Sequence, residues 1–254
     1  MAQDRGVLIV FDLVSTLTDA GPRYVQAFLD VTEKAGFERP DPAAVMDMLG
    51  NKNLSEITDT FAAGLDPAGK KEFMQECNDA CDILLRKPGW KERLFPNVRE
   101  AIETMHLRGV TLGIYTGTRE DAMTSQLAYH GIEDLFKADY MRGKDNLRDA
   151  GKANTALKAE QLQSIVCAFR AKHGDKAPVI VIGDSRADAE AAAAQGLYFI
   201  GFATDAHKRE LLENAGVRAI VTDFGDVPDL IDRLTKPPAN DLQRRPGKGL
   251  KFQP

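Results

Sequence analysis

The chain has 254 residues, 43% of them hydrophobic, and a formal net charge of −5. It can bury a large core, and its charge balance lacks the basic excess that nucleic-acid backbones attract. The three cysteines are an odd number and provide no disulfide framework, and no apolar run approaches the ~20 residues of a membrane span. We therefore expect a cytoplasmic protein with no nucleic acid and no membrane as partner. Cys77 and Cys81, four residues apart, could supply two metal ligands, although buried cysteine is more often a small apolar residue.

Short apolar runs predict six strands in chain order, at residues 7–11, 110–115, 138–141, 179–182, 198–202 and 219–221. Helix-length segments separate most of these runs, as parallel strands require. Six strands are too few for a closed barrel of eight. We therefore predict an α/β fold with a doubly wound, mostly parallel, Rossmann-like sheet.

One long interval, between the first two predicted strands, contains only helical patterning. Helices are predicted over residues 24–35, 42–49, 54–63 and 67–85, separated by glycine and proline. We interpret residues 21–90 as a helical cap inserted over the carboxyl end of the sheet, with residues 1–20 and 91–235 forming the α/β core. Residues 236–254 are rich in proline, glycine and basic residues and are predicted to be a flexible C-terminal tail.

The first strand ends at Asp12, in the stretch VLIVFDLVSTLTD of residues 7–19. A carboxylate at the end of a buried strand requires a cationic partner. Ser15, Thr16 and Leu17 follow in a turn of small residues that could present backbone N–H groups to an oxyanion. The alternative is an aspartate that only caps the next turn.

A second acidic pair follows the strand in PVIVIGDSRAD, residues 178–188. If Asp184 and Asp188 open a helix, its first turn brings both carboxylates toward one cavity, and Mg²⁺ prefers such oxygen ligands. Asp188 could instead be only a favourable charge at a helix N-terminus.

A hydroxyl and a glycine follow a third strand in LGIYTGT, residues 112–118. The hydroxyl of Thr116 and the N–H of Gly117 could bind a phosphoryl oxygen. Ordinary capping of a helix at residues 119–126 is the alternative.

A lysine precedes the long helix predicted over residues 153–170. Lys152 lies where the helix dipole is already positive, so an anion nearby would explain it. Lys144 is the competing candidate, and either lysine could simply be solvated.

In order and spacing, these four fragments resemble the motif set of the haloacid dehalogenase-like (HAD) superfamily of hydrolases, whose first-type helical cap has the position of residues 21–90. The resemblance implies that Asp12 is a nucleophile that forms an aspartyl phosphate, and that Thr116 and Lys152 bind the transferring group. It further implies a Mg²⁺ cofactor held by Asp12, the Val14 carbonyl and Asp184, with Asp188 in support. A small phosphorylated or phosphonate substrate would contact Ser15, Thr16, Gly117 and the cap.

Val14 departs from the pattern of the phosphatases in this superfamily, which have a second aspartate there as general acid and base. Losing such a group typically reduces the rate by about 10² to 10⁴. Phosphonoacetaldehyde hydrolases resemble this chain in lacking that aspartate, and their cap lysine forms a Schiff base. Lys52, between Asn51 and Asn53, has about the matching spacing and is either that lysine, a specificity residue or exposed. We therefore favour a phosphonatase-like hydrolase.

Two other classes stay open. The 2-haloacid dehalogenases resemble the chain in lacking the second aspartate, but they have an aromatic residue there and need no metal. The other class is a catalytically weak protein that keeps the fold and binds a ligand or partner. An apolar face of the cap could also pair with its own copy in a homodimer.

Overall fold

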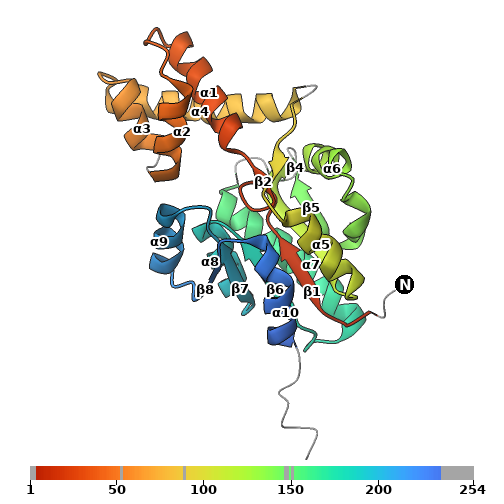
Figure 1. Cartoon of the computed structure of the whole chain (residues 1–254). Helices are drawn as coiled ribbons and strands as arrows, with labels where there is room; N and C mark the ends of the chain where they lie inside the picture. The colour runs from red at the N-terminus through yellow and green to blue at the C-terminus, as the bar shows by residue number, and fades with distance from the viewer. Residues whose placement is uncertain (1–3, 52–53, 88–89, 146–148, 150–151, 236–254) are drawn as a thin grey trace, which may run out of the picture.

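A six-stranded sheet forms the centre of the computed structural model, in the order β5-β4-β1-β6-β7-β8 (Figure 1). Every neighbouring pair in it is parallel. The strands are β1 (Leu8–Phe11), β4 (Thr111–Arg119), β5 (Met141–Lys144), β6 (Val179–Gly183), β7 (Tyr198–Phe202) and β8 (Ala219–Val221). The structure describes residues 4–51, 54–87, 90–145, 149 and 152–235. The prediction for residues 236–254 lies outside this range.

Helices cover both faces of the sheet, because the buried strands are apolar on both sides. In the first strand, Ile9 and Phe11 pack into one core cluster, whereas Leu8 and Val10 pack into another. The first cluster is covered by α5 (Val98–Leu107), α6 (Glu120–Tyr129) and α10 (Val227–Thr235). The second is covered by α7 (Asn154–His173) and α8 (Arg186–Ala194). The predicted doubly wound α/β fold is confirmed.

Four helices follow the first strand and form a separate group above the sheet (Figure 1). They are α1 (Gly21–Lys34), α2 (Pro42–Asn51), α3 (Leu54–Phe61) and α4 (Pro67–Arg86), and we call this group the cap. Phe28 lies at the centre of its own apolar cluster, in edge-to-face contact with Phe61 and Phe73. Helix α4 begins where predicted because Asp66 accepts a hydrogen bond from the Gly69 N–H and Pro67 occupies the first turn.

Two short strands connect the cap to the sheet, and we did not predict them. β2 (Thr18–Asp19) and β3 (Arg93–Leu94) pair antiparallel. Each has two residues, too few to produce a periodic pattern in the sequence. They join the two segments through which the chain enters and leaves the cap.

The strand predicted at residues 138–141 is displaced. Residues Ala138–Tyr140 form a 3₁₀ turn, η2, and β5 begins at Met141. Tyr140 is buried and packs edge-to-face against Phe169 of α7. The apolar signal therefore came largely from a turn packed against a helix.

The order in which strands are added to the sheet reverses at β1, because β4 and β5 lie on one side of it and β6, β7 and β8 on the other. Phe11, its last residue, is in register with Ile114 of β4 on one side and Ile182 of β6 on the other. In open α/β sheets, ligands bind outside the carboxyl ends of the strands at such a switch point. Among the described helices, none combines the length and apolarity needed to cross a bilayer.

Candidate active site

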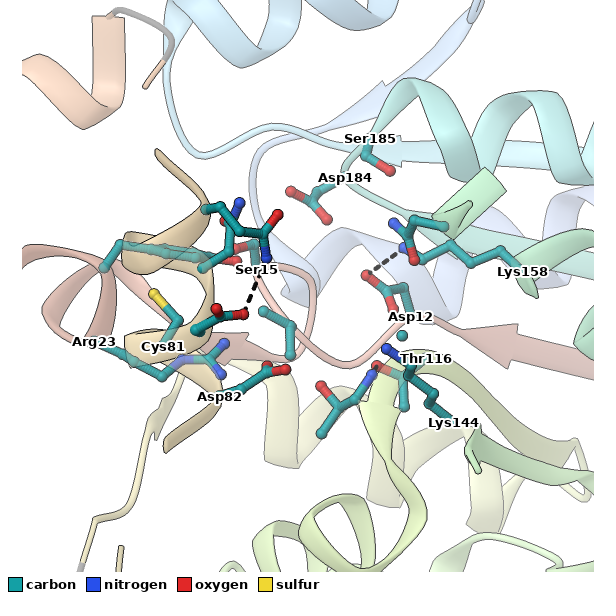
Figure 2. Close-up of a pocket in the computed structure, with 18 residues that line it drawn as sticks. Asp12, Ser15, Arg23, Cys81, Asp82, Thr116, Lys144, Lys158, Asp184 and Ser185 are labelled. Atoms are coloured by element: carbon teal, nitrogen blue, oxygen red, sulfur yellow. Dashed lines mark hydrogen bonds and ion pairs between the residues drawn. The ribbon is translucent and has the colours of Figure 1, made fainter. Parts of the chain in front are cut away.

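Three carboxylates meet at the switch point. Asp12 follows β1, Asp184 follows β6, and Asp188 lies in the first turn of α8. One oxygen from each lies within 4.8 Å of the others. Figure 2 shows Asp12 and Asp184 on facing sides of the same pocket. The structure thus brings together the acidic residues that we singled out in the sequence.

Asp12 is buried and has one oxygen without a partner. Its Oδ2 lies 3.2 Å from the Lys158 ammonium, whereas none of the described residues donates a hydrogen bond to its Oδ1. Burial raises the pKa of the Asp12 carboxyl to about 8; Asp188 and Asp184 add to the rise and Lys158 opposes it. A buried, unpartnered carboxylate oxygen beside a second carboxylate fits a divalent cation.

A lysine that we did not predict, Lys158, contacts the acids of the site. It lies on the buried face of α7, and its Nζ is 2.8 Å from Asp188 Oδ1 and close to Asp12. Burial alone would lower the pKa of the Lys158 ammonium, but the Asp12 and Asp188 carboxylates outweigh it, so the pKa lies above its usual value. Lys158 therefore stays charged between two acids.

Lys152, the predicted lysine, lies elsewhere. Its ammonium pairs with Asp149 and Glu160, and it is not among the described residues that line the pocket. Lys152 precedes α7, and its two neighbouring carboxylates explain why a positive charge is tolerated at the start of that helix. Lys144, the competing candidate, ends β5 and does line the pocket (Figure 2).

Asp188 is occupied by protein donors on both oxygens. Oδ1 accepts hydrogen bonds from the Tyr115 hydroxyl (2.7 Å) and from Lys158, and Oδ2 accepts from the N–H and hydroxyl of Ser185. Ser185 is also the N-cap of α8 and forms a capping box with Asp188. Asp188 thus fixes the lysine in place from the start of the helix.

Asp184 is held from two sides. Its Oδ1 accepts a hydrogen bond from the Thr16 hydroxyl at 3.0 Å, and its Oδ2 lies 2.5 Å from the ammonium of Lys208. Lys208 belongs to α9 (Ala206–Asn214). The turn after β1 and a helix from the far edge of the sheet therefore both orient this carboxylate.

The turn after Asp12 uses two of its amides internally. The Ser15 N–H donates to the Thr18 carbonyl and the Leu17 N–H to the Leu13 carbonyl. Those two N–H groups therefore do not form the anion-binding nest that we predicted. Ser15 lines the pocket with a left-handed backbone, φ +61°, and Val14 lines it as well.

Thr116 lies in an irregular extension of β4, where the pairing with β5 shifts register after Tyr115. Its hydroxyl accepts from the Thr118 N–H rather than capping α6, and its carbonyl accepts from Gln161 of α7. The neighbouring Gly117 allows a close approach, because a Cβ there would lie 2.7 Å from Asn154 Oδ1. Thr116 and Gly117 both line the pocket.

The pocket has a volume of about 520 Å³ and is walled on one side by the cap. The cap contributes α1 and α4 side chains; those lining the pocket are Arg23, Tyr24, Gln75, Asn78, Asp79, Cys81 and Asp82. Figure 2 shows the Arg23 guanidinium on this side, opposite Asp12. Arg23 is 4% exposed, and its Nε lies 2.8 Å from a Glu92 oxygen.

The remaining predicted residues belong to the cap. Lys52 and Asn53 lie outside the described residues. Asn51 is the last residue of α2, and its side chain is also outside them. Their roles stay predictions.

Of the three residues near the acids that we did not predict, only Lys158 had a recognisable signal in the sequence. On α7, Leu157, Lys158, Gln161, Leu162 and Ile165 are all buried. Leu157, Gln161 and Ile165 follow the i, i+4 spacing of a core-facing stripe, and Lys158 and Leu162 follow it one residue later. A lysine within such a stripe needs a buried anion. Tyr115 and Lys208 carried no comparable signal, since only the fold brings them to the acids.

Residues 7–196 match the family model described as haloacid dehalogenase-like hydrolase. A phosphoglycolate phosphatase from Vibrio cholerae is 25% identical over 230 residues, which cover 88% of this chain and 96% of the relative. One from Vibrio vulnificus (strain YJ016) is 30% identical over 139 residues, and the match spans 54% of this chain and only 61% of that relative's length.

Solved structures agree on the fold. A haloacid dehalogenase-like family hydrolase from Streptococcus pneumoniae has a TM-score of 0.63 at 20% identity, with 88% of this chain and 97% of that chain covered. A predicted phosphoglycolate phosphatase from Haemophilus somnus has a TM-score of 0.60 at 21% identity, with 88% and 97% covered.

Proposed function

The chain belongs to the haloacid dehalogenase-like hydrolases, and we propose that it hydrolyses a small phosphorylated or phosphonate metabolite with Asp12 as nucleophile. One observation carries the proposal: a buried Asp12 with one oxygen on Lys158 and the other without a partner, facing Asp184. A carboxylate so placed is oriented by its lysine, and one of its oxygens can face a cation while the other attacks phosphorus.

Mg²⁺ fits the donor set of the site. Asp12, the Val14 carbonyl and Asp184 would hold it, while Asp188, whose oxygens are already occupied, would act through Lys158. When bound, the ion supplies positive charge that neutralises the phosphoryl oxygens. Asp184 would have to exchange its contact with Lys208 for the metal.

The reaction proposed for these residues has two steps. In the first, an Asp12 oxygen forms a bond to phosphorus and the bond to the leaving group breaks, giving an aspartyl phosphate. In the second, water attacks that phosphorus, releasing phosphate and restoring the carboxylate. Lys158 and the Thr116 hydroxyl bind oxygens of the phosphoryl group that is transferred. They therefore stabilise the negative charge on those oxygens during both steps.

Val14 restricts the substrates that suit this site. It lines the pocket two residues after the nucleophile and cannot protonate a leaving alkoxide. Substrates whose leaving group departs without a proton therefore fit best: acyl and aryl phosphates, or a phosphonate activated as a Schiff base by Lys52. Phosphoglycolate, named for the relatives, has an alkoxide leaving group and is the substrate that tests this restriction.

A phosphate-release assay tests the proposal. The full chain with Mg²⁺ should hydrolyse acetyl phosphate or phenyl phosphate, and Asp12→Asn should abolish turnover. Asp30→Asn, a change at an exposed carboxylate of α1, serves as the matched control and should keep it. A thermal shift with phosphate or phosphonate ligands but no product would instead indicate a binding protein.

The phosphonatase branch has its own test. Borohydride treatment with phosphonoacetaldehyde should trap a covalent adduct at Lys52 if that lysine forms a Schiff base. Absence of the adduct in wild-type protein that still hydrolyses aryl phosphates would remove Lys52 from the mechanism. Chloride or fluoride release from a 2-haloacid would favour the dehalogenase alternative.

A further inference from the structure

A second cavity, of about 430 Å³, adjoins the first between cap and sheet. Four residues line both cavities: Ser15, Tyr24, Asn78 and Cys81. The second cavity thus shares a wall with the first, formed by Ser15 of the turn after Asp12 and by three cap residues. Its apolar and thiol lining comes from all four cap helices and one core residue: Phe28, Met46, Leu49, Leu54, Cys77, Cys81 and Phe95. We call it the apolar chamber.

Most of the chamber wall is uncharged; its charged lining residues are Asp19, Asp205 and Lys208. Burial raises the pKa of the Cys77 thiol to about 12 and that of the Cys81 thiol to about 11, so both are neutral near pH 7. Neutral buried thiols behave as small apolar groups. As neutral thiols, these two cysteines extend the apolar surface of the chamber.

The charged residues at the rim of the chamber already have protein partners. Asp19 accepts a hydrogen bond from the Gly21 N–H, and Asp205 accepts one from the Lys208 N–H at the start of α9. The Lys208 ammonium is paired with Asp184. These charged residues thus have protein partners in the structure, and Lys208 would lose its partner if Asp184 bound Mg²⁺; apolar residues form the larger part of the wall that a ligand would contact.

We propose that the apolar chamber binds the leaving-group portion of the substrate, which makes the substrate class a phosphate monoester with an aryl leaving group. This inference rests on the proposed function, because it needs the phosphoryl group to lie at Asp12. A leaving group of that kind would leave water for an apolar wall, which is favourable.

A small charged leaving group suits the chamber poorly. Glycolate has no apolar part to contact Phe28, Leu54 and the neutral thiols, and Lys208 is the one cation among the described lining residues that could pair with its carboxylate. The volume, by contrast, is in the range of pockets that hold small organic ligands, about 300 to 1,000 Å³.

Two phosphonates that differ only in their apolar part test the proposal. Dissociation constants of methylphosphonate and benzylphosphonate for the full chain would be measured by calorimetry with Mg²⁺ present. Benzylphosphonate should bind at least about tenfold more tightly, as an added apolar group in a matching pocket does. Equal affinities would overturn the proposal.

A pair of variants locates the effect. Met46 is 39% exposed and lines the chamber, whereas Ile83 is 61% exposed on α4 and is absent from the described residues that line it. Met46→Asp should reduce the ratio of the two dissociation constants to near one, and Ile83→Asp should leave the ratio unchanged. A ratio that stays high in Met46→Asp, in protein with a normal melting temperature, would place the benzyl group elsewhere and overturn the proposal.

Measuring turnover alongside binding distinguishes a failure of this inference from a failure of the proposed function. If acetyl phosphate is hydrolysed in an Asp12-dependent way while the two phosphonates bind equally, the hydrolase stands and the apolar chamber is not a substrate site. If no phosphate is hydrolysed and neither phosphonate binds, both proposals are overturned.

Discussion

Ser15 is the clearest case in which a single residue is placed against its backbone preference. Its φ of +61° lies in the left-handed region, which glycine adopts freely and other residues adopt at a cost. The turn it forms carries Val14 and positions Thr16 on Asp184. Part of the folding free energy is therefore used to keep this turn beside the nucleophile.

We predict that Ser15→Gly raises the free energy of unfolding by about 0.5–1 kcal/mol, because glycine relieves the left-handed strain. Denaturant unfolding measures the change. Ser164→Gly, at an exposed position in the middle of helix α7, is the matched comparison and should lower stability, since glycine weakens a helix interior. A loss of stability in both variants would contradict the claim that the backbone of Ser15 is strained.

In the reaction that we propose, Val14 restricts which leaving groups can depart. We predict that Val14→Asp raises kcat for an alkyl phosphate by up to about 10²-fold, because it supplies the missing proton. Val14→Asn has a similar size and no such proton, so it should give no gain. Steady-state kinetics on phosphoglycolate would check both, and equal rates in the two variants would remove the general-acid explanation.

At the scale of elements, the cap is fixed to the core by a buried cluster at Glu92. One Glu92 oxygen lies 2.8 Å from Arg23 of α1, and the other accepts a hydrogen bond from the Thr18 hydroxyl of β2 at 2.6 Å. Both Arg23 and Glu92 are 4% exposed. This cluster joins both chain crossings, so it ties the start of the cap to its end.

Removing one partner of this pair should leave a buried charge behind. We predict that Glu92→Leu lowers the free energy of unfolding by about 3–5 kcal/mol. The double variant Arg23→Leu with Glu92→Leu should recover most of the loss, since no charge is then stranded. Equal stability of the single and double variants, by denaturant unfolding, would show that the pair is not coupled.

The cysteines of α4 and α7 should differ in reactivity. Cys167 is exposed, whereas Cys77 and Cys81 are buried and their raised pKa values keep them as thiols. Iodoacetamide at pH 8 should therefore modify one cysteine quickly, identified by mass spectrometry, and all three after unfolding. The same shifts imply that stability falls as pH rises from 9, the ordinary thiol value, toward 11, since only the unfolded chain then loses these protons.

Much of this architecture could be predicted from the sequence, for physical reasons. Buried parallel strands and amphipathic helices carry their own periodic patterns, so β1 and β6 and the helices of the cap were found close to their observed bounds. The acids at the strand ends converge because parallel strands share one carboxyl edge.

What the sequence could not predict depends on packing. Lys158 and Lys152 are both plausible near the start of α7, and only the rotation of that helix on the sheet decides which ammonium reaches Asp12. The same holds for Lys208, which comes to Asp184 from another edge of the fold. Two-residue strands such as β2 have too little pattern to be recognised.

At the scale of the whole molecule, stability is concentrated in the middle of the sheet. Strand β1 is hydrogen-bonded on both sides and its residues are 0% exposed. Helices α2 and α3 have partly exposed faces and belong to a smaller apolar cluster. The cap is therefore expected to open locally more easily than the core.

Hydrogen exchange followed by mass spectrometry would check this ranking. Peptides covering β1 and β6 should exchange last, near the rate of global unfolding, and peptides from residues 42–61 should exchange first. Saturating benzylphosphonate with Mg²⁺ should slow exchange in the cap more than in β1. Uniform protection across cap and sheet would contradict two clusters of unequal stability.

The central position of β1 also has a consequence for how the protein is made. Its partners, β4 and β6, are encoded about 100 and 170 residues later, so a ribosome working at about 5–20 residues per second leaves the first strand without any neighbour for about 5–20 seconds and without its second neighbour for about 9–34 seconds. During that time an apolar segment ending in the future nucleophile is bare on a nascent chain. Newly made protein should therefore depend on chaperones most strongly before β6 has emerged.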